Sequence, residues 1–548
     1  MLHDSVYMNF LVLFLGLSIQ VQALTPFSNG SWPITHHDSW NSDTSPFPGP
    51  RGETSLRVER TLLLPHDLHP FTLADPISLV TSSSDSTIWA SSINSVLALQ
   101  RNIDGSLSLK AAHYRDFNFE FHGAYALAHR NGLYYTTTDN SIQAYSFNST
   151  SKVIVLELEY LIPNMRDSEH LIGLSALATT NAELVYCTSY GLIGIIQSSL
   201  SKKSVPVSVQ LYGLDIAALP SKLVSNSFAV DDNCGIYVVT SISMNKVTYN
   251  EETQTLELQW ATSYSDGQDP WLMGRLGPGS GSSPTLMSET DNHNEEPEYV
   301  IITDGRISPM HILAFDAKSG KVAASKSVDF GDPHGLGAAV TSEQSVVVSG
   351  RRALVVNNYV VDQIGTFCGE VFPKLPINDV LLHSCPMMFG KHAFGVQQFE
   401  LVSDSTGISW SDKWSNREVS CTSSIPGLST HIPMSVFCLG RRGKTFTLES
   451  VDWDSGKSLW YKALGNSLAW NSQYAGTEIG THDDIIMGTL TGILRVTTNV
   501  EESSLEKTEL EDPRWLALQN IQETVDKCII SATMGYRSLL GLLSTTKN

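Results

Sequence analysis

The stretches ILAFDAKSGKVAA (312–324) and ESVDWDSGKSLWYK (449–462) share one pattern: an apolar run, an Asp, a Ser-Gly-Lys turn and a second apolar run. The Asp side chain can start such a turn by accepting hydrogen bonds from backbone N–H groups. Gly supplies the positive φ that the turn requires. Each stretch is therefore typical of a β-hairpin.

Related strand–turn–strand stretches precede these two, at 97–110, 143–157 and 246–260. Their spacing fits a period of about 45 to 50 residues, and four short strands in such a period form one blade of a β-propeller. This period predicts eight four-stranded blades, with seven as the alternative. Helical patterns are nearly absent in this region, which disfavours TIM-barrel and dinucleotide-binding folds. The predicted fold class is therefore an all-β propeller.

Composition divides the chain into five segments. An apolar run at 8–21, followed by small residues up to Ala23, predicts a secretory signal peptide; a buried N-terminal helix is the alternative. No other run is long and apolar enough for a transmembrane helix, so we expect a secreted, extracellular protein. The predicted segments are a signal peptide (1–23), an extended N-terminal arm (24–60), the propeller (61–497), an acidic linker (498–512) and a C-terminal helical segment (513–548).

The C-terminal segment carries a helical pattern. Asp512 and Pro513 provide a helix N-cap and a first helical residue. Apolar residues at helical spacing then predict an amphipathic helix over 513–533: Trp515, Leu518, Ile521, Val525, Ile529 and Ala532. We expect this helix to dock on the propeller. The alternative is a peripheral membrane helix, but the polar face lacks the Lys/Arg band that such helices use.

Composition and charge exclude several classes of protein. Of the 548 residues, 41% are hydrophobic and 17% are charged, so the chain can form a core and is neither disordered nor a long coiled coil. The net charge of −21 opposes binding to the phosphates of nucleic acid. We expect the partner to be a small molecule or an extracellular glycan, and the protein to be a monomer.

Two modifications are expected in an oxidising compartment. The sequons at Asn29 and Asn148 predict glycosylation. Cys421 with Cys438, and Cys368 with Cys385, would close short loops and are the predicted disulfides, each stabilising by about 3 kcal/mol through the unfolded chain. A bond between Cys187 and Cys234, across neighbouring repeats, is a further alternative.

The turns at 314–322 and 451–462 resemble the PQQ-like propeller repeat, commonly A-x-D-x-x-T-G-K-x-x-W, whose Trp packs between blades. Most of the chain resembles a family of secreted PQQ-like β-propeller proteins of bacteria and fungi, through blocks at 35–50, 121–145, 224–241, 279–287, 299–305, 355–360 and 467–476. The resemblance implies the fold and export. It implies no catalytic residue, because that family has no settled activity.

Quinoprotein dehydrogenases resemble the chain in their repeats, yet two of their features are missing. They use an adjacent Cys-Cys pair or related contacts over the quinone, and no adjacent cysteines occur here. The stretch 452–456 begins like a Ca²⁺ loop, but Ala463 stands where the twelfth-position Glu would be. No zinc-type His spacing occurs either, so we predict no metal site and leave the cofactor open.

Three residues are the predicted acid/base groups. His37 lies in the arm, which either caps or enters the channel or pins the last blade to the first. Strand alternation would separate His37 from His36 and Asp38. His122 precedes a Gly that allows close approach, and Asp304 ends a buried apolar run, where a carboxylate is costly unless it is paired or functional. For each, a purely structural role is the alternative.

Further polar and aromatic residues close to strand ends are the predicted ligand-binding set: Asp38, Trp40, Asn41, Asn226, Ser280, Ser283, Asn357, Asn358, His431 and Asn471. Ser280 and Ser283 lie in a Gly-Ser turn whose amides could bind an anion or simply bend the chain. The asparagines could bind a ligand or bridge blades.

The leading hypothesis is a secreted propeller that binds a small organic or sugar-like molecule in its central channel, with a possible non-redox lyase, isomerase or cyclase step. One alternative is a non-catalytic module that binds an extracellular glycan or protein. The other is a quinone-dependent dehydrogenase.

Overall fold

The computed structural model describes the arm from residue 32 and the body of the chain up to residue 498. The described ranges are 32–52, 56–62, 78–81, 87–92, 95–103, 105–115, 125–163, 165–167, 169–179, 183–196, 207–211, 223–265, 275, 277–290, 296–307, 309–332, 340–359, 390, 393–405 and 407–498. The predicted signal peptide, His122, Asn29, Cys368, Cys385 and the C-terminal helix lie outside the described residues.

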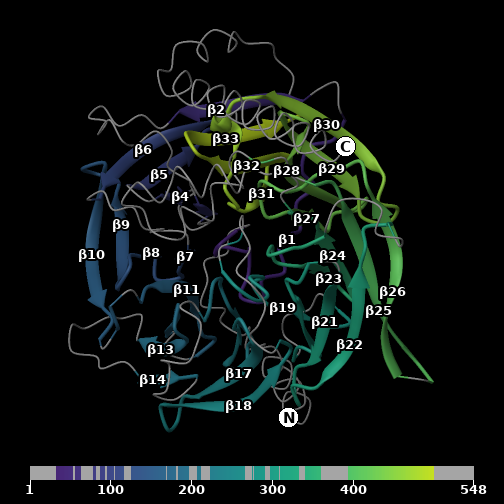
Figure 1. Ribbon diagram of the computed structural model, residues 1–548. Coiled ribbons are helices and arrows are strands. Elements are labelled where there is room, and N and C mark those ends of the chain that lie inside the picture. Colours follow the sequence, from purple (N-terminus) through teal and green to yellow (C-terminus); the bar gives the residue numbers. More distant parts are fainter. Residues whose placement is uncertain are drawn as a thin grey trace, which may run out of the picture.

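Eight β-sheets form a ring, which confirms an all-β propeller and decides the blade number (Figure 1). Blade 1 contains β3 (Ser78–Thr81), β4 (Thr87–Ser91), β5 (Ser95–Arg101) and β6 (Leu107–Tyr114), and blade 2 contains β7 (Ala126–Ala128), β8 (Tyr134–Thr137), β9 (Ser141–Asn148) and β10 (Val153–Leu161). Blade 3 contains β11 (Leu171–Ala176), β12 (Leu184–Thr188), β13 (Leu192–Ile196) and β14 (Val207–Gln210), and blade 4 contains β15 (Ala229–Val230), β16 (Gly235–Val239), β17 (Ser243–Asn250) and β18 (Thr255–Ser263).

The second half of the ring continues the same order. Blade 5 contains β19 (Thr285–Met287), β20 (Tyr299–Thr303), β21 (Met310–Asp316) and β22 (Val322–Val328). Blade 6 contains β23 (Val347–Ser349), β24 (Arg352–Val356), β25 (Val396–Asp404) and β26 (Gly407–Asn416). Blade 7 contains β27 (Gly427–Ser429), β28 (Ser435–Arg442), β29 (Thr445–Asp452) and β30 (Ser458–Gly465). Blade 8 contains β31 (Thr477–Gly480), β32 (Asp484–Thr489) and β33 (Gly492–Thr497), and a 3-10 helix, η4 (Leu468–Trp470), precedes it.

Blade 8 is completed by a strand from the other end of the chain. Strand β2 (Arg57–Leu62) pairs antiparallel with β33 as the fourth strand. The buried Asp484 on β32 binds Arg101 of blade 1 and Arg495 of β33, whose Nη1 lies 2.8 Å from Glu59 Oε2 on β2. Hydrogen bonds and charges from both ends of the chain therefore close the ring.

The core lies between blades as well as within them. In each blade the first strands are buried and the fourth strand is partly exposed, as in β8 against β10. One apolar cluster joins Phe437 and Leu448 of blade 7 to Ile479 and Leu494 of blade 8, and another joins blades 5 and 6. The Trp460 of the repeat pattern lies in the first cluster, so it packs between blades, as the sequence pattern predicts.

The two repeat turns have the predicted chemistry. Asp316 Oδ1 accepts hydrogen bonds from the Ser319 backbone N–H at 2.6 Å and from its hydroxyl at 2.7 Å, and Gly320 has a φ of 72°. The turn that begins at Asp452 has the same contacts with Ser455. These turns also receive a Trp from the preceding blade: Trp260 Nε1 donates to Ala317 O at 3.2 Å.

Residues 33–45 of the arm, here called the inner arm, lie inside the ring (Figure 1). Its backbone accepts hydrogen bonds from the innermost strands of blades 2, 4, 5, 6 and 7. The donor–acceptor pairs are Ala128 N to Pro33 O (2.7 Å), Val230 N to Ser39 O (2.7 Å), Leu286 N to Trp40 O (3.0 Å), Val348 N to Ser42 O (3.3 Å) and Leu428 N to Asp43 O (2.8 Å). Strand β1 (Thr44–Ser45) then pairs parallel with β27. The inner arm therefore occupies the channel at the level of these strands.

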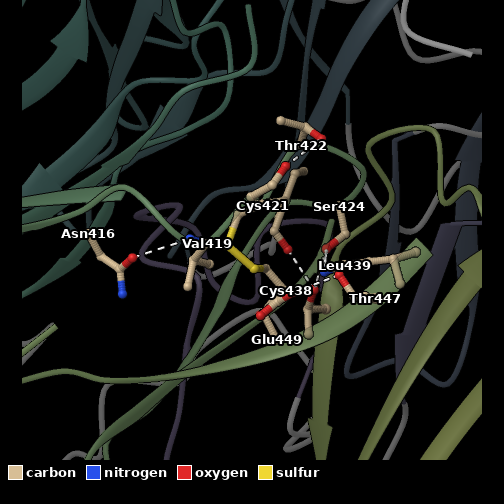
Figure 2. The surroundings of a disulfide bond; sticks show 12 residues. Asn416, Val419, Cys421, Thr422, Ser424, Cys438, Leu439, Thr447 and Glu449 are labelled. Atoms are coloured by element: carbon tan, nitrogen blue, oxygen red, sulfur yellow. Dashed lines mark hydrogen bonds between the residues drawn. A yellow bond between two sulfur atoms is a disulfide. The ribbon is translucent and has the colours of Figure 1, made fainter. Parts of the chain in front are cut away.

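One predicted disulfide is present. Cys421 precedes β27 and Cys438 lies on β28, with Cα atoms 5.4 Å apart, and Figure 2 shows the bond beside Val419, Ser424 and Leu439. Ser424 Oγ accepts a hydrogen bond from the Leu439 N–H at 2.8 Å. The alternative pairing is wrong, because Cys187 and Cys234 are both free thiols. No helix among the described residues is long and apolar enough to cross a membrane.

Candidate functional site

The site residues gather on one face of the ring. In each blade the chain enters the first strand on this face, and because neighbouring strands are antiparallel, the connection between the second and third strands returns to it. We call it the entry face. Six residues on it form what we call the entry-face cluster: Tyr125, Asn226, Arg275, Glu343, Asn358 and Tyr474.

A buried Arg–Glu pair is the centre of the cluster. Arg275 is 4% exposed and Glu343 is 2% exposed, with Arg275 Nε 3.7 Å from Glu343 Oε2. Arg275 also donates to the carbonyl oxygens of Gly279 at 2.7 Å and Ser280 at 2.6 Å, to the Gly305 carbonyl and to Thr341 Oγ1. A buried charge needs such partners to offset its desolvation, and here they also hold the guanidinium in one place.

Two tyrosines reach the pair from other blades. Asn358 Nδ2 donates to the Tyr474 hydroxyl at 3.0 Å, and burial together with the negative charge of Glu343 raises the pKa of Tyr474 well above its ordinary value. Burial, the neighbouring Cys187 and the charge of Glu343 also raise the pKa of Tyr125. Both phenols therefore stay protonated and act as hydrogen-bond donors at neutral pH.

The cluster spans the mouth of the channel. Tyr125 belongs to blade 2 and Glu343 to blade 6, on opposite sides of a ring of eight, and the charge of Glu343 still raises the pKa of Tyr125, which indicates that both side chains extend toward the axis. Tyr125 donates to Asn226 Oδ1 at 3.0 Å, and Asn226 Nδ2 donates to Gly281 O at 2.8 Å. Blades 2, 4, 5, 6 and 8 therefore all contribute to one polar network above the inner arm.

Two buried oxygens beside Glu343 have no hydrogen-bond partner among the described residues. They are Ser342 Oγ and Gln344 Oε1, in side chains that are 1% and 3% exposed. The amide nitrogen of Gln344 is used, because it donates to Cys421 O at 3.3 Å. Buried polar atoms are nearly always hydrogen-bonded in proteins, so these two indicate room for water or for a polar ligand.

Asp304 does not stand alone. Its Oδ1 accepts from the backbone N–H groups of Arg306 at 3.1 Å and His311 at 2.9 Å, and its Oδ2 lies 2.8 Å from His311 Nδ1. The His311 side chain is 25% exposed, whereas that of Asp304 is 4% exposed. The buried carboxylate therefore orients a histidine that solutes can reach.

The two histidines of the arm have different surroundings. His36 and His37 have φ angles of 71° and 72°, so the arm is not extended there and the predicted alternation of side chains is absent. His37 packs edge-on against Trp32, with ring centroids 5.2 Å apart. His36 Nε2 lies 3.1 Å from Ser283 Oγ, and His36 Nδ1 lies 3.2 Å from Asp43 Oδ1.

The Ser283–His36–Asp43 order is that of a nucleophilic triad, but it lies inside the ring. Ser283 and Asp43 are fully buried, and His36 is 1% exposed. Ser345 Oγ donates to Asp43 Oδ2 at 2.8 Å and completes the network. A nucleophile must meet its substrate, so we assign these four residues to fixing the inner arm between blades 5 and 6.

The other predicted arm residues fix local structure. Asp38 Oδ1 accepts from the backbone N–H groups of Trp40 at 2.9 Å and Ser42 at 3.1 Å, which is a helix-cap-like turn. Trp40 packs in the apolar cluster between blades 4 and 5. Asn41 Nδ2 donates to Pro284 O at 2.9 Å.

The remaining predicted residues lie on both faces. Ser280 Oγ donates to Thr303 O at 2.6 Å, Asn471 Oδ1 accepts from Ser423 Oγ at 2.7 Å, and Asn357 Nδ2 donates to Phe394 O at 3.3 Å, all on the entry face. His431 follows β27 on the opposite face, where its Nδ1 lies 2.8 Å from Arg51 Nη2. Glycosylation of the exposed Asn148, the last residue of β9, stays a prediction.

Sequence reasoning selected Asn226 and Asn358 but missed the other cluster members. Arg275 and Glu343 lie in Ser- and Gly-rich stretches without a recognisable spacing. His311 had one usable signal, because it lies directly across the hairpin from Asp304. Within the described residues, no three His, Cys, Asp or Glu side chains are grouped to hold a metal ion.

Comparison with known proteins supports the fold and leaves the activity open. No protein-family model matches the chain. A protein of Archaeoglobus fulgidus, described as uncharacterized, is 28% identical over 479 residues, which cover 85% of this chain and 87% of that protein. The crystal structure of quinohemoprotein alcohol dehydrogenase from Comamonas testosteroni is similar with a TM-score of 0.53 at 12% identity, over 88% of this chain and 82% of that one.

Proposed function

We propose that the protein binds a small, uncharged, hydroxyl-bearing molecule, such as a sugar, at the entry-face cluster. The observation that carries this proposal is the convergence of buried and half-buried polar side chains from blades 2, 4, 5, 6 and 8 toward the axis of the ring. The inner arm occupies the channel below, so the ligand site is a mouth above the arm rather than a through-channel.

The chemistry of the cluster suits hydroxyl groups. Tyrosine hydroxyls and asparagine amides donate and accept hydrogen bonds, which matches the two-way hydrogen bonding of a sugar hydroxyl. Arg275 and Glu343 oppose each other's charge, so the pair favours a neutral ligand. Ser342 and Gln344, the chain neighbours of Glu343, carry buried acceptor oxygens that no described residue uses. Export of the protein, glycosylation and a place in the secreted PQQ-like family stay predictions that agree with this proposal.

Native mass spectrometry of the protein from its own source, before and after denaturation, identifies a ligand that co-purifies. Calorimetry with a panel of neutral methyl glycosides then measures affinity. We expect Glu343→Gln to weaken binding at least about tenfold, because hydrogen bonds to a charged group are the stronger ones. Glu449→Gln is the matched control, a buried carboxylate paired with Arg442 on blade 7. Equal binding by wild type and Glu343→Gln would refute the site.

A second candidate is a non-catalytic module for an extracellular glycan or protein. The occupied channel favours it, because a surface-binding propeller does not need an open axis. Binding of the full chain to an immobilised polysaccharide, with no affinity for any glycoside of the panel, would favour this candidate over the first.

The quinone hypothesis receives no support from the described residues. A bound quinone would need a Ca²⁺ cage of carboxylate and amide oxygens, and no three His, Cys, Asp or Glu side chains are grouped to hold a metal ion in the described part of the chain. The carboxylates at the mouth are instead committed to Arg275 and His311. We therefore derive no step through a quinone.

A further inference from the structure

We propose that His311, oriented by Asp304, is the proton acceptor of the ligand site and takes a hydrogen bond, or in a reaction the proton, from a hydroxyl of the bound molecule. This inference rests on the proposed function. In the proton-transfer step the ligand O–H bond breaks and its electron pair stays on the ligand oxygen, which becomes negatively charged. The lone pair of Nε2 forms the new N–H bond, and the carboxylate of Asp304 stabilises the resulting imidazolium.

The hydrogen-bond chemistry fixes which imidazole nitrogen is available. An ionised carboxylate only accepts hydrogen bonds, so His311 Nδ1, 2.8 Å from Asp304 Oδ2, must carry the hydrogen. The lone pair of the neutral ring then lies on Nε2. The side chain is 25% exposed, and no residue of the described structure is hydrogen-bonded to Nε2. That nitrogen is therefore an oriented acceptor that solutes can reach.

The loop between β20 and β21 does not require the contact between Asp304 Oδ2 and His311 Nδ1. Asp304 Oδ1 alone accepts the two backbone N–H groups that shape the loop between β20 and β21. An asparagine would satisfy the same two donors. The second oxygen is thus free to orient His311, which is what a dyad needs and a turn does not.

The dyad adjoins the entry-face cluster through one residue. Arg275 donates to the carbonyl of Gly305, the neighbour of Asp304, and to Thr341 Oγ1, which itself donates to the Gly305 carbonyl at 3.1 Å. Arg275 in turn faces Glu343. The same short turn therefore supports both the Arg–Glu pair and the dyad, on the same face of the ring.

The charged and titratable groups around the dyad are few. On its own loop Arg306 follows Asp304, and its backbone N–H binds the carboxylate. Across the hairpin, His311 pairs with Ser327 of β22, which is uncharged. From the preceding segment, Arg275 contacts Gly305. The only carboxylate hydrogen-bonded to His311 in the described structure is that of Asp304.

The first test reads the proton position directly. ¹⁵N NMR of histidine-labelled full-length protein should show His311 with hydrogen on Nδ1 and none on Nε2. In Asp304→Asn the amide donates to Nδ1, so the hydrogen should move to Nε2 while the turn is kept. Diethyl pyrocarbonate at pH 8.5, followed by peptide mass spectrometry, should modify His311 at least about tenfold more slowly in this variant. Asp316→Asn, at the other end of β21, is the control and should change neither signal.

The second test distinguishes failure of the proposed His311 role from failure of the proposed ligand site. We expect His311→Gln to weaken methyl glycoside binding about tenfold. If His311→Gln binds like wild type while Glu343→Gln does not, the dyad role is wrong and the proposed function stands. If wild type binds no glycoside, the proposed function fails. The inference is also overturned if Asp304→Asn leaves the His311 hydrogen on Nδ1 or the modification rate unchanged.

Discussion

At the scale of single residues, Tyr134 shows how burial controls ionisation. It lies on β8, is fully buried, and stacks on Trp89 of blade 1 with ring centroids 4.9 Å apart and planes 5° apart. Burial is the main reason that its pKa rises from 10.0 to about 12. The phenol is therefore part of the interface between blades 1 and 2 only in its neutral form.

The raised pKa makes stability fall at alkaline pH. The unfolded chain loses this proton near pH 10 and the folded chain only near pH 12, so the free energy of unfolding falls by up to about 1.4 kcal/mol per pH unit across that window. Tyr134→Phe should remove this contribution to the fall of the unfolding free energy with pH. Urea unfolding at pH 9 to 12 measures it, with the exposed Tyr461→Phe as control. A wild-type slope in Tyr134→Phe would contradict the assignment.

Residue identity also explains what sequence reasoning found at the site. Asp304 was predicted because a carboxylate after a buried strand is costly without a partner, and the structure supplies that partner in His311. His311 itself was not predicted, although it lies directly across the hairpin from Asp304. Arg275 and Glu343 meet only because two successive blades bring their loops together, which no local pattern reports.

At the scale of elements, the repeat turns require glycine both for its positive φ and because there is no room for a Cβ atom. Gly456 has a φ of 70°, and a Cβ placed on it would meet the ring of Trp414, whose Cγ would lie 2.9 Å away. Trp414 Nε1 donates to Trp453 O at 2.9 Å in the same turn. Gly443 provides a comparison, with a φ of 66° and no atom within 4 Å of the added Cβ.

Two substitutions distinguish the cost of backbone strain at a positive φ from the cost of displacing Trp414. Gly443→Ala should lower the free energy of unfolding by about 1 kcal/mol through its positive φ alone. Gly456→Ala should lower it by about 3 kcal/mol, because displacement of Trp414 is added to the same strain. Chemical unfolding of both variants measures the difference. Equal losses would show that Trp414 moves aside without cost.

The hairpins and turns could be predicted because their chemistry is local. Asp316, Ser319 and Gly320 are neighbours in sequence, and their contacts follow from residue type. The inner arm could not be predicted in this way. Its turn depends on positive φ angles at two histidines, and its partners are strands up to 434 residues away in sequence. The sequence predicts that an arm exists, but not its path inside the ring.

At the scale of the whole molecule, Asp484 is the central residue of the ion pairs that join blade 8 to blade 1 and close the ring. This buried carboxylate binds Arg101 of blade 1 and Arg495 of blade 8, and Arg495 also binds Glu59 of β2. Three segments of the chain thus share one set of charges. The period of the repeats predicted eight blades or seven. The ring has eight, and its last blade is completed by β2, which begins within the predicted arm (24–60).

Loss of this carboxylate should be costly. Asp484→Asn leaves two arginines with one carboxylate between them, and removing one partner of a buried ion pair typically costs about 3 to 5 kcal/mol. Asp454→Asn removes the partner of Arg352 in an exposed pair and should cost less than about 1 kcal/mol. Thermal and urea unfolding compare the two. Similar losses would show that closure does not depend on the charge of Asp484.

The path of the inner arm has a consequence for biosynthesis. Ser45 Oγ donates to Ile479 O across 434 residues of sequence, so a segment that leaves the ribosome early cannot form its final contacts until the last blade has been made. Such long-range contacts slow folding. Throughout translation the emerging chain carries a partly apolar segment without its native partners, and this is the stage at which chaperones would be needed.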